Sequence, residues 1–192
     1  LAVLDPDRML IVDLFACEDG EAQERRMFPE VIPSAQANDL WIADRNFCTT
    51  RFLFGLARRL AYFVIRQHKS TLSWEKETKA KKIGRCETGV IYEQKLYLLD
   101  GDDVLIVRRI TVQLDKPTRS GETEVNVLTN LSPSDANAAK VAELFRCARC
   151  LRVGTCRRHS IVRALAIRSC SVRARSTWGT SLESPGRSAA AT

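Results

Sequence analysis

Residues 39–69 restrict the fold of this chain more than any other segment. The apolar run Leu40–Ala43 is typical of a strand that is buried on both faces. After it, Thr49 can accept a hydrogen bond from a free N–H group of a helix start, and apolar residues then recur at helical spacing as far as Leu60. Residues 62–65 form a second buried run. A strand, a helix and a strand in this order predict a parallel crossover, and therefore an α/β fold.

Polar side chains follow each of these two predicted strands at the point where the strand ends. Asp44 comes directly after the first strand, and Arg66 and His68 follow the second. Ligands of open parallel sheets bind beyond the carboxyl ends of the strands, so a carboxylate beside a guanidinium predicts a phosphate-handling site. The same residues are also compatible with simpler roles, in which Asp44 caps the following turn and Arg66 lines the rim. From the pattern alone we favour these simpler roles.

Outside this unit, the sequence predicts further strands and two more helices. The chain opens with two apolar runs joined by a turn, and a short helix then follows that Pro33 is expected to end. Residues 70–124 contain β-rich segments separated by polar turns, which predict an antiparallel insertion. The chain is expected to return to the main sheet near residues 125–128 and to form a last helix over residues 136–146. Residues 1–146 are therefore expected to form one domain.

Residues 147–192, called the tail below, differ in composition from the rest. The tail holds nine arginines, no lysine and a single acid, Glu183, whereas residues 1–146 hold 21 basic and 22 acidic residues. One interpretation is a basic disordered arm that binds nucleic acid. The other is that a reading-frame shift near residue 146 replaced the original continuation, which also explains the missing lysine and the unfinished helix. We favour the second interpretation, and expect a disordered basic tail.

The sequence also bears on the compartment. No apolar run has the length of a membrane helix, and no signal peptide opens the chain, so we expect a cytoplasmic protein without a membrane partner. The seven cysteines do not suggest a disulfide framework in a chain of this size and kind.

Several segments, in their order along residues 1–146, resemble bacterial insertion-sequence transposases of the DDE type. The segments are residues 40–48 (LWIADRNFC), 63–68 (FVIRQH), 108–109 (RR), 115–119 (DKPTR), 124–131 (EVNVLTNL) and 142–146 (AELFR). The resemblance implies an RNase H-like mixed sheet whose three acidic residues hold two Mg²⁺ or Mn²⁺ ions for DNA cleavage and strand transfer. It also implies DNA (transposon ends) as partner, a homo-oligomer on that DNA, and a nucleoid-associated protein in a bacterial cytoplasm.

The resemblance carries roles to particular residues. Asp44 matches the second acidic residue of the family, which is a catalytic residue and a metal ligand. By the same resemblance, Arg45, Arg66, His68 and Arg146 are expected to contact DNA. His68 also fits a plain rim position.

The other two acidic residues have no clear match. The first is expected on a strand that precedes residue 1, and Asp13, the nearest internal candidate, lies on what the pattern predicts to be the family's third strand. The third is expected near Arg152, inside the tail. The prediction is therefore a transposase-type strand transferase in a degraded, inactive copy. The alternative is a non-catalytic nucleic-acid-binding protein that acts through its arginine-rich tail.

The missing first strand has a structural consequence. In RNase H-like sheets it lies between the second and fourth strands, so residues 1–15 and residues 40–65 are expected to lack their shared neighbour. Either the two parts close onto each other or the main-chain groups in the core stay unpaired and the fragment is marginally stable.

Overall fold

The computed structural model describes residues 1–5, 10–16, 24–68, 72–150 and 160–164. Their strands form one sheet in the order β2-β1-β10-β3-β4-β9-β8-β7-β5. Strand β6 pairs with residues 89–93 of β7, and β5 pairs with residues 96–98 of the same strand. The strands are β1 (Ala2–Asp5), β2 (Leu10–Leu14), β3 (Leu40–Ala43), β4 (Tyr62–Arg66), β5 (Trp74–Glu77), β6 (Lys81–Cys86), β7 (Gly89–Asp100), β8 (Asp103–Leu114), β9 (Glu124–Thr129) and β10 (Ser160–Ala164). The pairs β1–β10 and β3–β4 are parallel, and the other pairs are antiparallel. The predicted α/β class is therefore confirmed, with a mostly antiparallel mixed sheet.

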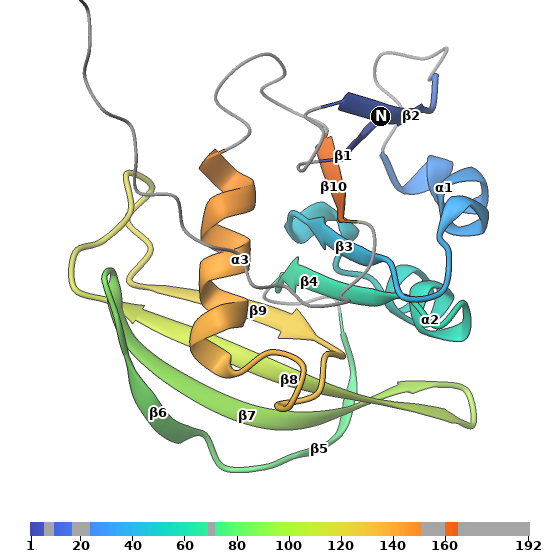
Figure 1. The fold of residues 1–192 in the computed structure, drawn as a ribbon. Helices are drawn as coiled ribbons and strands as arrows, with labels where there is room; N and C mark the ends of the chain where they lie inside the picture. The colour runs from blue at the N-terminus through green and yellow to red at the C-terminus, as the bar shows by residue number, and fades with distance from the viewer. Residues whose placement is uncertain (6–9, 17–23, 69–71, 151–159, 165–192) are drawn as a thin grey trace, which may run out of the picture.

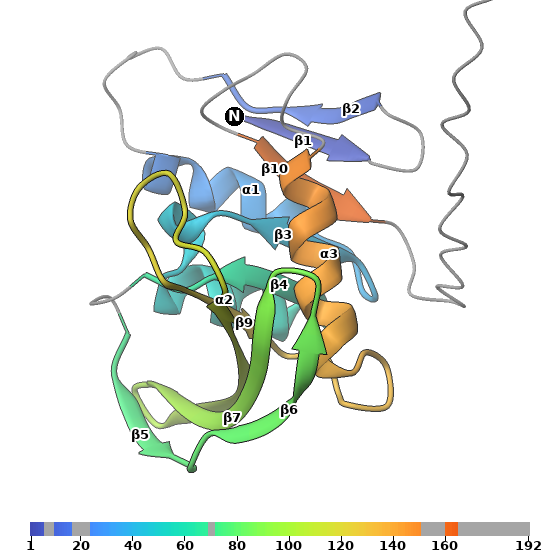
Figure 2. The same ribbon diagram turned by 90° about the vertical axis from the view of Figure 1, so that its left-hand side faces the viewer.

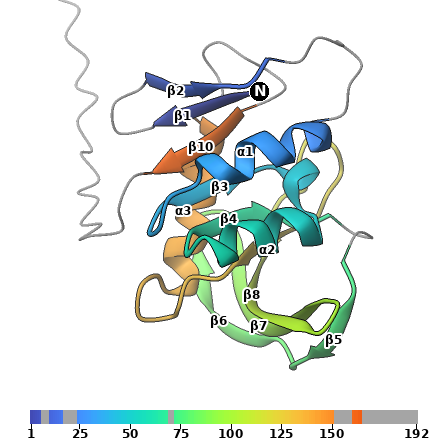
Figure 3. The ribbon, with the colours of Figure 1, turned by 90° about the vertical axis from the view of Figure 1, so that its right-hand side faces the viewer.

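Helices cover both faces of this sheet. They are η1 (Glu24–Met27), α1 (Phe28–Ser34), η2 (Arg45–Phe47), α2 (Thr50–Arg58) and α3 (Ala138–Cys150). Helices α1 and α2 lie on one face of β3 and β4, and α3 lies on the other (Figures 1 and 3). Each face has its own apolar core, one built around Trp41 and Phe52 and the other around Val64 and Val141. None of the helices described here is long and apolar enough to span a membrane.

The β3–α2–β4 unit forms as the sequence predicts. All four residues of β3 are buried, and β3 pairs in parallel with β4, with Leu40 opposite Tyr62. The Thr49 hydroxyl accepts a hydrogen bond from the Phe52 N–H at 3.3 Å, so it caps the N-terminus of α2. The unit places the carboxyl ends of β3 and β4 at the same edge of the sheet.

Leu60 departs from the prediction that it belongs to the buried stripe of α2. The helix ends at Arg58, and the Leu60 side chain is 72% exposed. The Leu60 N–H donates to the Ala57 carbonyl, and the Ala61 N–H donates to the Leu56 carbonyl, which is the hydrogen-bond pattern of a Schellman cap. Such a cap requires a left-handed residue, and Leu60 adopts φ 58°. The turn toward β4 therefore points this side chain to solvent.

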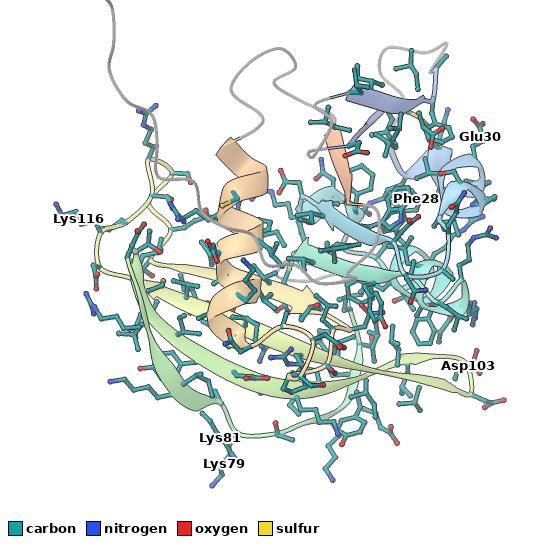
Figure 4. All side chains as sticks on the ribbon, viewed as in Figure 1. Phe28, Glu30, Lys79, Lys81, Asp103 and Lys116 are labelled. Carbon is teal, nitrogen blue, oxygen red and sulfur yellow. The ribbon has the colours of Figure 1, made fainter. Side chains whose placement is uncertain are left out.

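Helix α1 is shorter than predicted and packs closely on α2. A 3-10 turn replaces the expected beginning of the helix, and Pro33 lies inside α1 instead of ending it. Phe28 of α1 points into the core (Figure 4), where the centre of its ring lies 4.8 Å from that of the Phe52 ring of α2. A Cβ added at Gly55 of α2 would lie 2.8 Å from Cδ1 of Ile32, so this glycine allows the close approach of the two helices.

The antiparallel strands predicted within residues 70–124 are present, and the chain then returns to the main sheet where expected. Strands β7 and β8 form a long hairpin, and β9 pairs with both β8 and β4. These strands curve around α3, which lies against their concave face (Figures 1 and 2). Buried Arg108 holds the segment before α3, because its guanidinium donates to the carbonyls of Leu131 and Ala136 and to the carboxylate of Glu93.

A strand from the tail occupies the position between β1 and β3. Residues Ser160–Ala164 pair in parallel with β1 and antiparallel with β3. The expectation of a wholly disordered tail therefore does not hold for these residues, nor for the end of α3, which continues to Cys150. The physical reason is that β1 and β3 present facing main-chain donors and acceptors that need partners. The remaining tail residues, including Arg152, lie outside the described part of the chain.

Candidate functional site

Asp44 lies directly after β3 and caps the next turn. Its side-chain oxygen Oδ1 accepts a hydrogen bond from the Arg45 N–H at 2.7 Å, which begins η2. The side chain is half-buried. The simpler role that the sequence allowed for Asp44 is thus present in the structure, at the edge of the sheet where a ligand of parallel strands would bind.

Arg66, the last residue of β4, forms an ion pair with a residue that the sequence interpretation did not single out. Its side chain is only 13% exposed, and its Nη2 donates to Oε2 of Glu122 at 2.5 Å. Glu122 belongs to residues 115–123, the loop between β8 and β9. The hydrogen bond from Arg66 lowers the pKa of Glu122 below its ordinary value, against an opposing effect of burial, and the charge of Arg45 adds to the lowering. Glu122 is therefore ionised at neutral pH and balances the charge of Arg66.

A small cavity of about 210 Å³ lies at this edge. The residues that line it come from three separate segments: Arg45, Arg66, Gln67, His68, Glu122, Glu124 and Asn126. Three of the four residues predicted to contact DNA thus lie around one cavity. Its two arginines face two glutamates, so the formal charges of these four side chains cancel.

Two buried polar atoms of the cavity residues have no hydrogen-bond partner in the described part of the protein. They are Oε1 of Gln67 and Nδ1 of His68. A neutral imidazole can carry its proton on either nitrogen, and a glutamine amide can present either its oxygen or its nitrogen. Each of these two residues can therefore act as a donor or as an acceptor at its buried atom.

Arg146, the fourth predicted DNA contact, lies elsewhere. It sits near the end of α3, where its Nη1 is 3.4 Å from Oε2 of Glu87. It lines a larger cavity of about 920 Å³ together with Val125 and Val127. Because side chains alternate between the faces of a strand, these two valines point to the opposite face from Asn126. The structure therefore does not bring Arg146 to the cavity of Arg66.

The structure also separates Asp13 from Asp44. Asp13 lies on β2, and β1 and β10 stand between β2 and β3. At roughly 4.8 Å between neighbouring strands, the two acidic residues are on strands about 14 Å apart, whereas two catalytic ions lie only about 4 Å from each other. No group of three His, Cys, Asp or Glu side chains suited to a metal ion occurs among the described residues. Asp44 is the single carboxylate of the expected three that these residues place at the site, so they do not fit a two-metal centre.

Glu122, Glu124, Gln67 and Asn126 were missed from the sequence, although one signal pointed to them. The return of residues 125–128 to the main sheet was predicted, and an antiparallel return places the residues before that strand beside those that follow Arg66. The observed hydrogen bond from the Gln67 N–H to the Asn126 carbonyl, at 2.8 Å, shows this placement.

Comparisons with known proteins do not assign the chain to a family. Neither the protein-family models nor the curated proteins include one that matches this sequence.

Proposed function

We propose that residues 1–146 belong to an RNase H-like DNA strand transferase of the transposase type, and that this chain contacts DNA phosphates without cutting them. The observation that supports the proposal is that Arg45, Arg66 and His68 line one cavity at the edge where the parallel strands β3 and β4 end, and that Asp44 directly follows β3 at this edge. These residues come from two separate sequence segments, and both segments carry the resemblance to transposases. The guanidinium groups of Arg45 and Arg66 suit the phosphates of a nucleic-acid backbone.

The proposed lack of cleavage follows from the ligand set. Two divalent ions that stabilise the attacking and leaving oxygens must be held by several carboxylates in fixed positions. Of the three carboxylates expected from the resemblance, Asp44 offers one, and its Oδ1 accepts a hydrogen bond from the Arg45 N–H. Affinity for DNA without positioning of the reacting groups does not lower the chemical barrier. This chain is therefore proposed to bind DNA without cleaving it, and Mg²⁺ or Mn²⁺ would be the cofactor of the active strand transferase.

A strand-transfer assay tests the proposal. The 192-residue chain is expected to leave labelled transposon-end DNA intact with either Mg²⁺ or Mn²⁺. A repaired chain, with an acid-bearing strand added before residue 1 and a glutamate-bearing helix in place of the tail, should cleave and join it. In the repaired chain, Asp44→Asn should abolish activity, whereas Asp102→Asn, at an exposed position in the β7–β8 turn, should not. Strand transfer by the unrepaired chain, or a repaired enzyme indifferent to Asp44→Asn, would contradict the proposal.

A second candidate function rests on charge. The tail carries nine of the thirty basic residues and one acid, which suits sequence-independent binding to any polyanion. Removal of residues 165–192 takes away four arginines and should lower the slope of log affinity against log salt by up to about 0.9 for each lost phosphate contact. If removal of residues 165–192 weakens DNA binding and Arg66→Gln does not, the tail is the DNA-binding part and the cavity of Arg66 is not.

A further inference from the structure

The carboxylate of Glu122 occupies the position where an anion would meet the guanidinium of Arg66. The two groups form a 2.5 Å hydrogen bond, and the side chains are 13% and 28% exposed. The ion pair is thus sheltered from water on the Arg66 side, while the Glu122 side chain keeps an open path to solvent.

The loop that carries Glu122 holds it firmly in this position. The Thr118 hydroxyl accepts a hydrogen bond from the Glu122 N–H at 3.1 Å, and the Thr118 N–H donates to the Glu122 carbonyl at 2.9 Å. Gly121 adopts φ 79°, a conformation that favours glycine, and closes the turn. The Ser120 hydroxyl lies 3.4 Å from Oε2 of Glu122. The backbone of the loop is therefore fixed, and only the Glu122 side chain has to rotate to free Arg66.

The cavity around this pair offers more donors than one carboxylate uses. Arg45 adds a second guanidinium, and the lining also includes His68 and Gln67, each of which has a buried polar atom without a partner among the described residues. A tetrahedral phosphate has more acceptor oxygens than a carboxylate and can engage several of these groups at once. The guanidinium groups of Arg45 and Arg66 therefore offer donors that suit a phosphate group.

We propose that Glu122 is an internal anion that occupies the phosphate-binding position of Arg66, and that a phosphate group of the DNA backbone must displace it to bind. The inference rests on the proposed function, because it concerns the same edge of the sheet. Glu122 sets the affinity of this cavity for DNA phosphates, because its carboxylate competes with each incoming phosphate for Arg66. The other role open to the pair is a plain structural tie between β4 and the loop, and the two roles predict opposite effects of removing the charge.

Glu124 provides a matched control in the same cavity. Its carboxylate accepts a hydrogen bond from the Asn126 amide at 3.0 Å. Glu124→Gln therefore removes the same charge from the same cavity without releasing Arg66. A general reduction of negative potential affects both glutamate variants equally, whereas displacement from Arg66 affects Glu122→Gln alone.

The test measures binding of the full chain to a 12-base-pair DNA duplex and, separately, to inorganic phosphate at fixed ionic strength. Glu122→Gln should tighten duplex binding by roughly fivefold, in line with the strength of a partly exposed ion pair, and Glu124→Gln by less than about twofold. Arg66→Gln should weaken binding, and Glu122→Gln should bring no gain in the Arg66→Gln background, because the glutamate acts through that arginine. The ¹⁵N signals of the Arg66 side chain should shift on addition of phosphate at lower concentration in Glu122→Gln.

The outcomes separate this inference from the proposed function. Two results would overturn the internal anion: equal effects of the two glutamate variants on duplex affinity, or a gain in affinity from Glu122→Gln that persists in the Arg66→Gln background. Either result is compatible with the proposed function as long as Arg66→Gln weakens duplex binding. A gain of Glu122→Gln for inorganic phosphate alone would support the internal anion and contradict the DNA contact. Thermal melting of each variant shows whether it is folded, and the Glu122→Gln change retains the size of the side chain.

Discussion

At the end of α2, Leu60 combines an unfavourable backbone conformation with an exposed apolar side chain. Its φ of 58° places it in the left-handed region, and 72% of its surface is exposed. A residue with a Cβ loses roughly 1–2 kcal/mol in this region. The two cap hydrogen bonds from Leu60 and Ala61 to the last turn of the helix hold the residue there. At this position the main chain, and not the side chain, decides the conformation.

Leu60→Gly is therefore expected to stabilise the protein. Glycine adopts the left-handed conformation without strain, although its greater freedom in the unfolded chain offsets roughly 0.5–1 kcal/mol of the gain. We expect the free energy of unfolding to rise by about 0.5–1 kcal/mol, measured as a higher urea midpoint at an unchanged slope. Leu60→Ala is the control, since alanine removes the exposed side chain but keeps the Cβ. An equal rise in the free energy of unfolding of both variants would show that the exposed side chain of Leu60, and not its backbone strain, lowers the stability of the parent protein.

Among the elements, the β7–β8 hairpin depends on close contact of two backbones at its open end. Gly89 pairs with Leu114, and a Cβ added at Gly89 would lie 1.9 Å from the carbonyl oxygen of Gln113. Neither strand can yield easily, because β6 also pairs with β7 and β9 also pairs with β8. The glycine is thus required by the register of the sheet.

Gly89→Ala is expected to lower the free energy of unfolding by about 1–3 kcal/mol, because the added methyl group forces the two strands apart. Gly84→Ala is the matched control: Gly84 lies in the neighbouring strand β6, and nothing lies within 4 Å of its added Cβ. We expect this second change to stay within about 0.5 kcal/mol of the parent. Calorimetric melting of the two variants measures the difference, and similar effects in both would contradict the contact at Gly89.

Elements that have a local sequence pattern could be predicted, whereas side-chain contacts between segments that are distant in the sequence could not. The β3–α2–β4 unit follows from local patterns: an apolar run, the Thr49 cap and helical spacing. The return of β9 could be predicted because its apolar residues follow a polar turn. The ion pair of Arg66 with Glu122 joins residues 56 positions apart, and nothing near either residue indicates it. The sequence therefore indicated Asp44, Arg45, Arg66 and His68, but not the other cavity residues Gln67, Glu122, Glu124 and Asn126.

At the scale of the whole molecule, the tail contributes to the sheet that the preceding residues form. Strand β10 is the shared neighbour of β1 and β3, so the N-terminal hairpin and the β3–β4 unit belong to one sheet through it. Without β10, main-chain groups of β1 and β3 that now pair across the sheet would lose their partners. The sequence predicted that residues 1–15 and 40–65 either close onto each other or keep unpaired main-chain groups. Neither is observed, because a strand from the tail lies between these two parts.

Two truncated chains test this role of β10. A chain ending at residue 164 keeps the strand, and a chain ending at residue 159 loses it, so the pair differs only in Ser160–Ala164. The longer chain should match the full protein, whereas the shorter one should lose at least about 2 kcal/mol of stability, because each lost hydrogen bond contributes about 1 kcal/mol and leaves groups unpaired. Amide hydrogen exchange should speed up in β1 and β3 of the shorter chain and stay unchanged in β7 and β8, which pair with neither strand. Equal urea midpoints and equal exchange in the two truncated chains would show that the sheet closes without β10.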